Sequence, residues 1–261
     1  MNTSFRPLAA LVILAASGPA SAAVQTRTIE YRQGETILEG YLAYDGAKSA
    51  KRPGVLVAHE WTGINAYTRR RVEQLAALGY VALAADLYGR GVRPATPKEA
   101  AETAGRYKAD RALLRARMEA SLAELRRQPA VDPARIAVIG YCFGGTAALE
   151  LARAGADVRG VVTFHGGLDT PTPADAKNIK AKVLALHGAD DPFVTEAIVK
   201  GFEDEMRAAK VDWQLVKYSG AVHSFTNPDA GNDNSKGAAY NAEADRRSWV
   251  AMKDFFDEIL R

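Results

Sequence analysis

The sequence predicts an α/β fold in which helices cover both faces of a mostly parallel central sheet. Strand-like and helix-like segments alternate along most of the chain, and several strand-like segments are near-continuous apolar runs. Alternation is typical of parallel sheets joined by helices, and continuous apolar runs are typical of strands buried on both sides. At 261 residues, 48% of them hydrophobic, the chain is long and apolar enough for one domain with a sizeable core.

The first 22 residues have the composition of a secretory signal peptide. Arg6 supplies a positive charge, residues 8–16 are apolar, and Ala20-Ser21-Ala22 is a small-x-small cleavage site. We expect cleavage after Ala22, which leaves a single domain over residues 23–261 in a periplasmic or secreted protein. The apolar run is too short to anchor the mature protein in a membrane.

The charge pattern excludes one class of partner. The formal net charge is +3, and no cluster of lysine and arginine is interleaved with aromatic residues. A nucleic-acid-binding protein would be expected to carry such a cluster. We therefore expect a small-molecule partner and, with no pattern that indicates assembly, a monomer.

The first half of the chain is expected to begin with an antiparallel hairpin. Gln33-Gly34-Glu35 separates its two β-rich runs, and Thr96-Pro97-Lys98-Glu99 has the N-cap, proline and glutamate of a helix start. The expected elements are strands at Thr26–Tyr31, Thr36–Tyr44 and Gly54–Ala58, a helix at Tyr67–Leu78, a strand at Tyr80–Ala85, and a helical region from Thr96 to Arg127 that Gly105 can break.

The second half continues the alternation of strands and helices. Its strand-like segments are apolar and rich in β-branched residues, and its helical segments are good helix formers or amphipathic. The expected elements are strands at Arg135–Ile139, Val158–Phe164, Lys182–Leu186 and Trp213–Tyr218, helices at Thr146–Arg153, Glu196–Lys210 and Tyr240–Leu260, and a polar loop at Thr226–Gly237.

Glycines surround the only cysteine of the chain, between an expected strand and an expected helix. The segment Gly140-Tyr141-Cys142-Phe143-Gly144 has the pattern G-x-C-x-G of a nucleophile elbow, with cysteine where serine is usual. Glycine is needed because a Cβ would clash on so sharp a turn. The N-terminus of the following helix would stabilise a thiolate on Cys142. With one cysteine in the chain, no internal disulfide can form.

Two further residues follow expected strands in the order of a catalytic triad. Asp191 comes after the strand Lys182–Leu186, and His223 comes after the strand Trp213–Tyr218. The order nucleophile, acid, base along the chain is that of the α/β-hydrolases. In such a triad His223 would accept the thiol proton of Cys142, and Asp191 would orient the imidazole.

Other titratable residues near the expected strand ends compete for these roles. Asp190 is an alternative acid, although the spacing from His187 favours Asp191. We interpret His187 as a structural histidine at a strand end and His59 as a residue behind the site. His165 is interpreted as structural or as lining the site.

Five segments carry most of the polar and glycine residues at the expected strand ends. They are His59-Glu60-Trp61-Thr62-Gly63-Ile64-Asn65, Asp86-Leu87-Tyr88-Gly89-Arg90, Gly140-Tyr141-Cys142-Phe143-Gly144-Gly145, Asp191-Pro192-Phe193-Val194 and Gly220-Ala221-Val222-His223-Ser224-Phe225. In this order they resemble the dienelactone hydrolase (carboxymethylenebutenolidase) family, over nearly all of the chain after the signal peptide. The resemblance implies an α/β-hydrolase fold and a cysteine hydrolase that opens an enol-lactone through a thioester, with no metal or cofactor.

The resemblance also implies roles for residues that the pattern alone leaves open. Glu60 matches a glutamate that lies beside the thiol and helps to activate it when substrate arrives. The backbone N–H groups of Phe143 and Trp61 match the oxyanion hole. Arg90 matches one of two arginines that hold a substrate carboxylate, whereas the second falls near Asn227 and is missing here.

The predicted substrate-binding set is therefore Arg90, Tyr88, His165 and Asn227. We expect hydrolysis of a small ester or lactone. The missing arginine and the expected export argue against dienelactone itself as the substrate. A general carboxylesterase or thioesterase on the same triad is the alternative, and a non-catalytic binding protein that keeps the fold is a third hypothesis.

Overall fold

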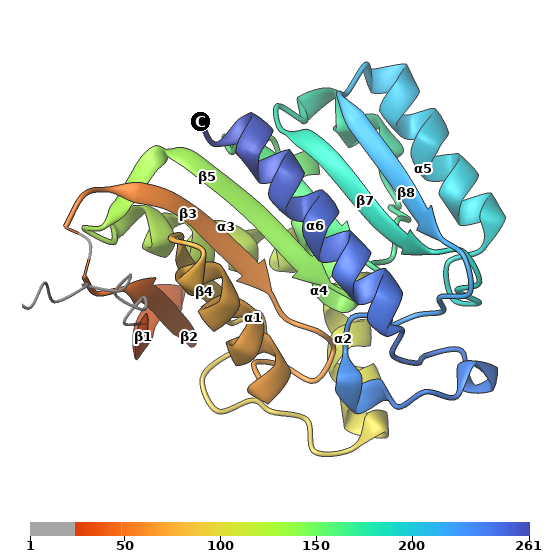
Figure 1. Cartoon of the computed structure of the whole chain (residues 1–261), viewed down its shortest axis with the longest axis horizontal. Helices are drawn as coiled ribbons and strands as arrows, with labels where there is room; N and C mark the ends of the chain where they lie inside the picture. The colour runs from red at the N-terminus through yellow and green to blue at the C-terminus, as the bar shows by residue number, and fades with distance from the viewer. Residues whose placement is uncertain (1–23, 48) are drawn as a thin grey trace, which may run out of the picture.

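Eight strands form one sheet in the computed structural model, which describes residues 24–47 and 49–261 (Figure 1). The strands are β1 (Val24–Gln33), β2 (Thr36–Asp45), β3 (Arg52–Ala58), β4 (Val81–Ala85), β5 (Val131–Tyr141), β6 (Gly160–Phe164), β7 (Lys182–Gly188) and β8 (Trp213–Tyr218). Their order across the sheet is β1-β2-β4-β3-β5-β6-β7-β8. The expected signal peptide lies outside the described residues and stays a prediction.

The sheet is mostly parallel, as the sequence predicted. Strand β1 pairs antiparallel with β2, and β2 pairs antiparallel with β4, so the antiparallel pairs belong to the N-terminal hairpin. From β4 to β8 every neighbouring pair is parallel. The parallel strands therefore end at one edge of the sheet, where open α/β sheets place their sites.

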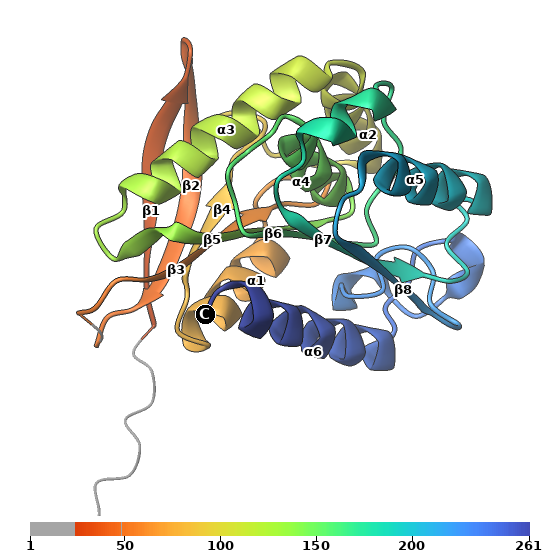
Figure 2. The same ribbon diagram turned by 90° about the horizontal axis from the view of Figure 1, so that it is seen from above.

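Helices cover both faces of the sheet (Figure 2). They are α1 (Ala66–Ala77), α2 (Pro97–Ala109), α3 (Arg111–Arg127), α4 (Phe143–Arg153), α5 (Glu196–Ala209) and α6 (Ala242–Ile259). Helices α1 and α6 lie on one face, whereas α3, α4 and α5 lie on the other. Each face has its own apolar core, with Leu75 and Phe256 on the first and Met118 and Phe202 on the second.

Helix α4 is buried along its whole length, although it carries two charged residues. Arg153 pairs with Glu150 at 3.0 Å and with Glu205 of α5 at 2.8 Å, and it also donates to the carbonyl of Leu168. Breaking such a pair on one side would leave an uncompensated buried charge, which costs about 3–5 kcal/mol. The pairs therefore hold α4 firmly against the sheet.

The helical region from Thr96 to Arg127 consists of two helices that meet at Asp110, so the expected break at Gly105 is wrong. The Asp110 carboxylate accepts the backbone N–H of Leu113 at 2.9 Å and thereby caps α3. Gly105 lies inside α2 with no atom near its missing Cβ, and the helix continues through it. A capping bond can start a new helix, whereas one exposed glycine only weakens a helix.

Short 3-10 turns and the start of β5 also differ from the elements expected from the sequence. The loop expected at Thr226–Gly237 contains two short 3-10 turns, η2 (Pro228–Ala230) and η3 (Asn234–Lys236), and a third, η1 (Pro173–Asn178), precedes β7. Each of η2 and η3 is capped by the side chain of the preceding asparagine or aspartate. Strand β5 begins earlier than expected because its first residues pair with the start of β3.

The close approach of α4 to β5 makes a first prediction. A Cβ on Gly140 would lie 1.9 Å from the carbonyl oxygen of Gly144, so Gly140→Ala should lower the free energy of unfolding by at least about 1–3 kcal/mol. Gly105→Ala, in open space on α2, should instead raise it by about 0.5–1 kcal/mol. Thermal unfolding of both variants measures the contrast, and an unchanged Gly140→Ala would contradict the described turn.

Candidate active site

The carboxyl ends of five parallel strands bring the predicted polar residues to one edge of the sheet. Glu60 follows β3, Cys142 follows β5, and His165 follows β6 directly. Asp191 and His223 lie a few residues after β7 and β8. Because these strands are neighbours in the sheet, side chains far apart in the sequence converge there.

Cys142 lies on the sharp turn that the sequence predicted. Its backbone has φ 54° and ψ −119°, and it is the N-cap residue of α4. The turn brings α4 so close to β3 that a Cβ on Gly144 would lie 2.2 Å from the carbonyl oxygen of Ala58. The nucleophile candidate is therefore held in a strained conformation by backbone that cannot move apart.

His223 and Asp191 form the rest of the predicted triad. The His223 Nδ1 atom lies 2.8 Å from Asp191 Oδ2. The other Asp191 oxygen accepts the backbone N–H groups of Phe193 at 2.8 Å and Val194 at 3.3 Å, which fixes the carboxylate. Asp191 is buried, whereas Asp190 is exposed, so Asp191 is the acid that contacts the histidine.

The neighbours of His223 and Asp191 shift the pKa values of both residues. Burial alone would lower the pKa of His223, but the negative charge of the Cys142 thiolate and the bond to Asp191 outweigh it and raise the pKa above its usual value. Burial raises and the His223 contact lowers the pKa of Asp191, with a net decrease. The contacts of His223 therefore favour its cationic form.

Glu60 is buried beside this triad and bonds a neutral partner. It is 4% exposed, and its Oε2 atom accepts a hydrogen bond from Asn227 Nδ2 at 2.7 Å. Burial raises the pKa of Glu60 from 4.5 to about 7, and the Asn227 bond and the charge of His223 only partly oppose it. Glu60 can therefore change its charge near neutral pH.

Phe143 and Trp61, whose N–H groups the resemblance assigns to the oxyanion hole, both lie at this site. Phe143 occupies the first position of α4, where the N–H has no partner within the helix. Trp61 follows Glu60 in the turn after β3, and its carbonyl accepts the Tyr88 hydroxyl. Both residues line the cavity that contains Cys142 and His223. The oxyanion hole at these two N–H groups stays a prediction.

The cavity beside the triad has a volume of about 480 Å³ and mixed polarity. Its lining residues are Trp61, Lys108, Cys142, Phe143, Gly167, Asp169, Phe193, Val194, His223, Ser224, Lys236 and Ala238. Asp169 pairs with Arg111, and Lys236 lies 3.7 Å from Asp233. Lys108 of α2 has no ion pair within the part of the chain that the structure describes. Neither lysine could be predicted from the sequence, because only tertiary packing brings them to this cavity.

None of the four predicted substrate-binding residues lines this cavity. Arg90 is half exposed and pairs with Glu30 of β1 at 2.8 Å. Tyr88 is buried and donates to the Trp61 carbonyl at 2.9 Å, and Asn227 bonds Glu60. His165 is completely buried. The side chain of each of these four residues bonds another part of the protein, although contact with the substrate was expected.

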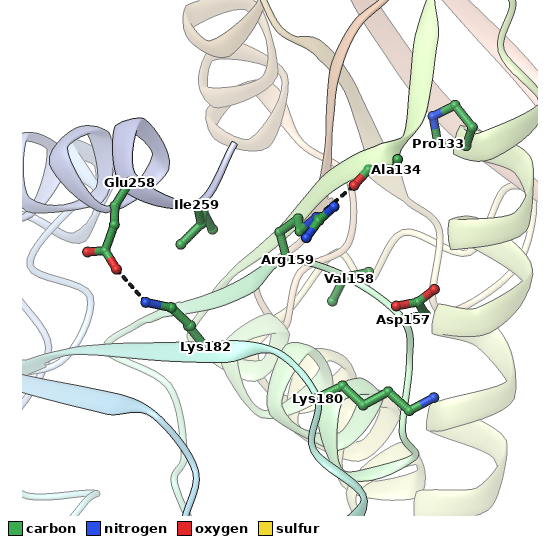
Figure 3. A pocket seen from close by; sticks show the side chains of 9 residues that line it. All are labelled: Pro133, Ala134, Asp157, Val158, Arg159, Lys180, Lys182, Glu258 and Ile259. Atoms are coloured by element: carbon green, nitrogen blue, oxygen red, sulfur yellow. Dashed lines mark hydrogen bonds and ion pairs between the residues drawn. The ribbon is translucent and has the colours of Figure 1, made fainter. Parts of the chain in front are cut away.

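A second cavity of about 510 Å³ lies at the opposite edge of the sheet, beside the starts of β6 and β7 (Figure 3). Lys182 on its wall pairs with Glu258 of α6, and Arg159 donates to the carbonyl of Ala134 (Figure 3). Its lining contains no cysteine, serine or histidine. This cavity therefore holds no counterpart of the Cys142, His223 and Asp191 cluster, and the candidate site is the one at Cys142.

Neither a metal site nor a membrane-spanning helix is found in the described part of the chain. Among residues 24–47 and 49–261, no group of three or more histidine, cysteine, aspartate or glutamate side chains is arranged to hold a metal ion. Over the same residues, no helix combines the length and the apolar character needed to cross a membrane.

Comparison with known proteins finds close similarity to one family. The model of the dienelactone hydrolase family matches residues 38–260. A Synechocystis protein named "Putative carboxymethylenebutenolidase" is 30% identical over 237 residues, which cover 86% of this chain and 93% of that protein.

Two solved structures are similar over 92% of this chain and the whole of their own. One, described as m3DLH, has 44% identity and a TM-score of 0.88. The other, described as a dienelactone hydrolase-like promiscuous phosphotriesterase from metagenomic libraries, has 43% identity and a TM-score of 0.87.

Burial of Glu60 predicts a pH-dependent cost in stability. A pKa raised from 4.5 to about 7 means that the folded state binds the proton more tightly, so the free energy of unfolding falls as pH rises through this range. Glu60→Gln removes the cost of ionising the buried carboxyl, so above pH 7 its free energy of unfolding should exceed that of the wild type by up to about 3 kcal/mol. Denaturant unfolding at pH 5 and pH 8 measures it, and a difference that does not grow with pH would contradict the raised pKa.

Proposed function

The chain belongs to the dienelactone hydrolase family of ester-bond hydrolases, and we propose that it cleaves small esters or lactones through a thioester on Cys142. The observation that carries the proposal is the hydrogen-bonded pair of His223 and Asp191, with His223 in contact with Cys142 at the cavity. A thiol, a base and an orienting acid in this arrangement are the parts that acyl transfer needs.

The proposed reaction begins with the Cys142 thiolate, whose proton is on His223. The thiolate attacks the carbonyl carbon of the substrate, and the oxygen becomes negative within reach of the Phe143 and Trp61 N–H groups. Collapse of this tetrahedral intermediate breaks the bond to the leaving oxygen, which takes the proton from His223. The acyl group is now a thioester on Cys142.

The second half of the reaction returns the enzyme to its starting state. His223, now neutral, accepts a proton from water as the water attacks the thioester carbonyl. Collapse of the second tetrahedral intermediate releases the carboxylic acid product and the Cys142 thiolate, with the proton again on His223. Asp191 stabilises the imidazolium at both stages. With a lactone, the leaving oxygen and the acid belong to one product molecule.

The charge of the cavity supports a substrate that carries an anionic group. Lys108 and Lys236 line the cavity, and its one acidic lining residue, Asp169, is already paired with Arg111. A carboxylate on the substrate would find an unpaired ammonium at Lys108. A general carboxylesterase or thioesterase would use the same triad without this preference.

Phosphotriester hydrolysis is a second candidate activity. It is supported by the 43% identical structure that is described as a promiscuous phosphotriesterase. A phosphotriester would be attacked by the same thiolate, and the same two N–H groups would face the phosphoryl oxygen. Turnover of a p-nitrophenyl phosphotriester by the wild type, lost together with esterase activity in a Cys142 variant, would support it.

The first functional prediction concerns the nucleophile. Cys142→Ala should lower kcat for a p-nitrophenyl ester by about 10⁴-fold or more, because no thioester can form. The melting temperature should be retained, which separates loss of chemistry from loss of fold. With the wild type, intact-mass spectrometry of rapidly quenched reactions should find the acyl-enzyme. More than about a tenth of wild-type turnover in Cys142→Ala would refute a cysteine nucleophile.

The second functional prediction separates Lys108 from Arg90. Lys108→Met should raise KM for a carboxylated ester by about fivefold, as expected for an exposed charge contact, and leave a neutral ester unaffected. The increase should shrink at high salt. Arg90→Met is the matched control, because Arg90 pairs with Glu30 outside the cavity. A selective loss in Arg90→Met and not in Lys108→Met would restore the role that the sequence indicated for Arg90.

A further inference from the structure

His165 occupies a position that its residue type makes unfavourable. It follows β6 with φ 41°, a left-handed conformation that glycine adopts more readily, and its side chain is completely buried. Gly166 follows it directly, so the strained position is held by a histidine although a glycine is its neighbour. A polar ring kept in a strained, buried position indicates that the ring itself has a function.

The two ring nitrogens of His165 bond different parts of the site. Nδ1 accepts the backbone N–H of Cys142 at 3.2 Å, an N–H that also bonds the carbonyl of Phe164 at 3.1 Å. Nε2 lies 2.7 Å from Thr226 Oγ1. Because Nδ1 accepts, the proton of the neutral ring is on Nε2, which donates to Thr226. The ring therefore joins the nucleophile turn to the segment that begins with His223.

The Thr226 end of this bridge is fixed in turn. The Tyr67 hydroxyl lies 2.6 Å from Thr226 Oγ1, and Arg71 donates to the Thr226 carbonyl at 2.8 Å. Arg71 is itself buried and pairs with Asp245 of α6. The His165 ring also packs edge-on against the His223 ring, with centroids 5.4 Å apart. The segment His223–Thr226 is thus held from two sides.

The surroundings keep His165 uncharged, which the bridge requires. Burial is the main cause that holds its pKa well below the usual value, and the positive charges of His223, Arg71 and His187 add to it. Protonation would place a hydrogen on Nδ1 and break the bond from Cys142. No carboxylate contacts the His165 ring within the described part of the chain, so no anion compensates a charge there.

We propose that His165 is a positioning residue whose uncharged imidazole ties the Cys142 turn to the segment that carries His223. The proposal rests on Cys142 as the nucleophile. His165 does not touch the substrate or the reacting sulfur. It acts by keeping Cys142 and His223 at the separation that favours the thiolate–imidazolium pair.

Two variants with opposite properties test this bridge. His165→Phe keeps a ring of similar volume and loses both hydrogen bonds, whereas His165→Asn loses the ring and can still accept from the Cys142 N–H at this φ. Alkylation of Cys142 by iodoacetamide, followed by intact mass between about pH 5 and 10, reports the thiol pKa without turnover. Thr226→Val removes the far hydrogen bond of the ring, together with the Tyr67 bond to the same hydroxyl, and serves if His165→Phe does not fold.

In His165→Phe the alkylation of Cys142 should slow, and most at low pH, because a misplaced His223 stabilises the thiolate less. The value of kcat should fall by about 100-fold with KM unchanged, as expected for a misplaced catalytic pair. His165→Asn should retain kcat within about tenfold, and Thr226→Val should slow the alkylation of Cys142 as His165→Phe does.

A wild-type profile in His165→Phe or in Thr226→Val would overturn the bridge. So would an equal loss in His165→Phe and His165→Asn at every pH, which would mean that the ring only fills space. Failure of the proposed function gives a different result. In that case wild-type Cys142 reacts no faster than a small thiol and forms no acyl-enzyme.

Discussion

The site depends on one strained residue, because Cys142 must hold φ 54° between a buried strand and a buried helix. A non-glycine residue persists there only if its surroundings determine its conformation, and here they do. Gly140 and Gly144 let α4 contact the neighbouring backbone, where a Cβ on either residue would overlap carbonyl atoms. Arg153 and its carboxylate partners fix the other end of α4. The packing that buries α4 therefore also fixes the Cys142 thiol at the carboxyl ends of the strands.

Around this turn the fold places three titratable groups in environments that move their pKa values apart. The contacts with Cys142 and Asp191 raise the pKa of His223. Burial and nearby positive charges lower the pKa of His165. Burial beside the neutral amide of Asn227 raises the pKa of Glu60. A site whose groups are separated in this way can hold an acid, a base and a neutral hydrogen-bond acceptor at one pH. The parallel sheet makes this possible, because adjacent strands deliver each group to the same edge from a different loop.

The sequence predicted what local pattern controls and missed what tertiary packing controls. The strands, the elbow and the order Cys142, Asp191, His223 could be identified because buried strands and glycine turns leave local signals. The helix break at Asp110 was missed because the break was expected at the glycine, Gly105. The hydrogen bond that caps α3 at Asp110 determines its position instead. Lys108 could not be found, since its helix reaches the cavity only after α2 packs beside the sheet. Arg90 matched a family position, yet its side chain pairs with Glu30, which the linear sequence cannot indicate.

The exchange of arginine for Asn227 links these observations. The family resemblance implies a substrate-binding arginine near this position, which is missing here. Here the neutral amide of Asn227 donates one hydrogen bond to Glu60 and supplies no charge, so burial determines the pKa of Glu60. Glu60 can therefore be neutral near pH 7 although it lies beside the proposed triad. The cations at the cavity are instead Lys108 and Lys236, on segments that do not contact Glu60. In the proposed function, attraction of an anionic substrate and control of the thiol would therefore lie in different parts of this chain.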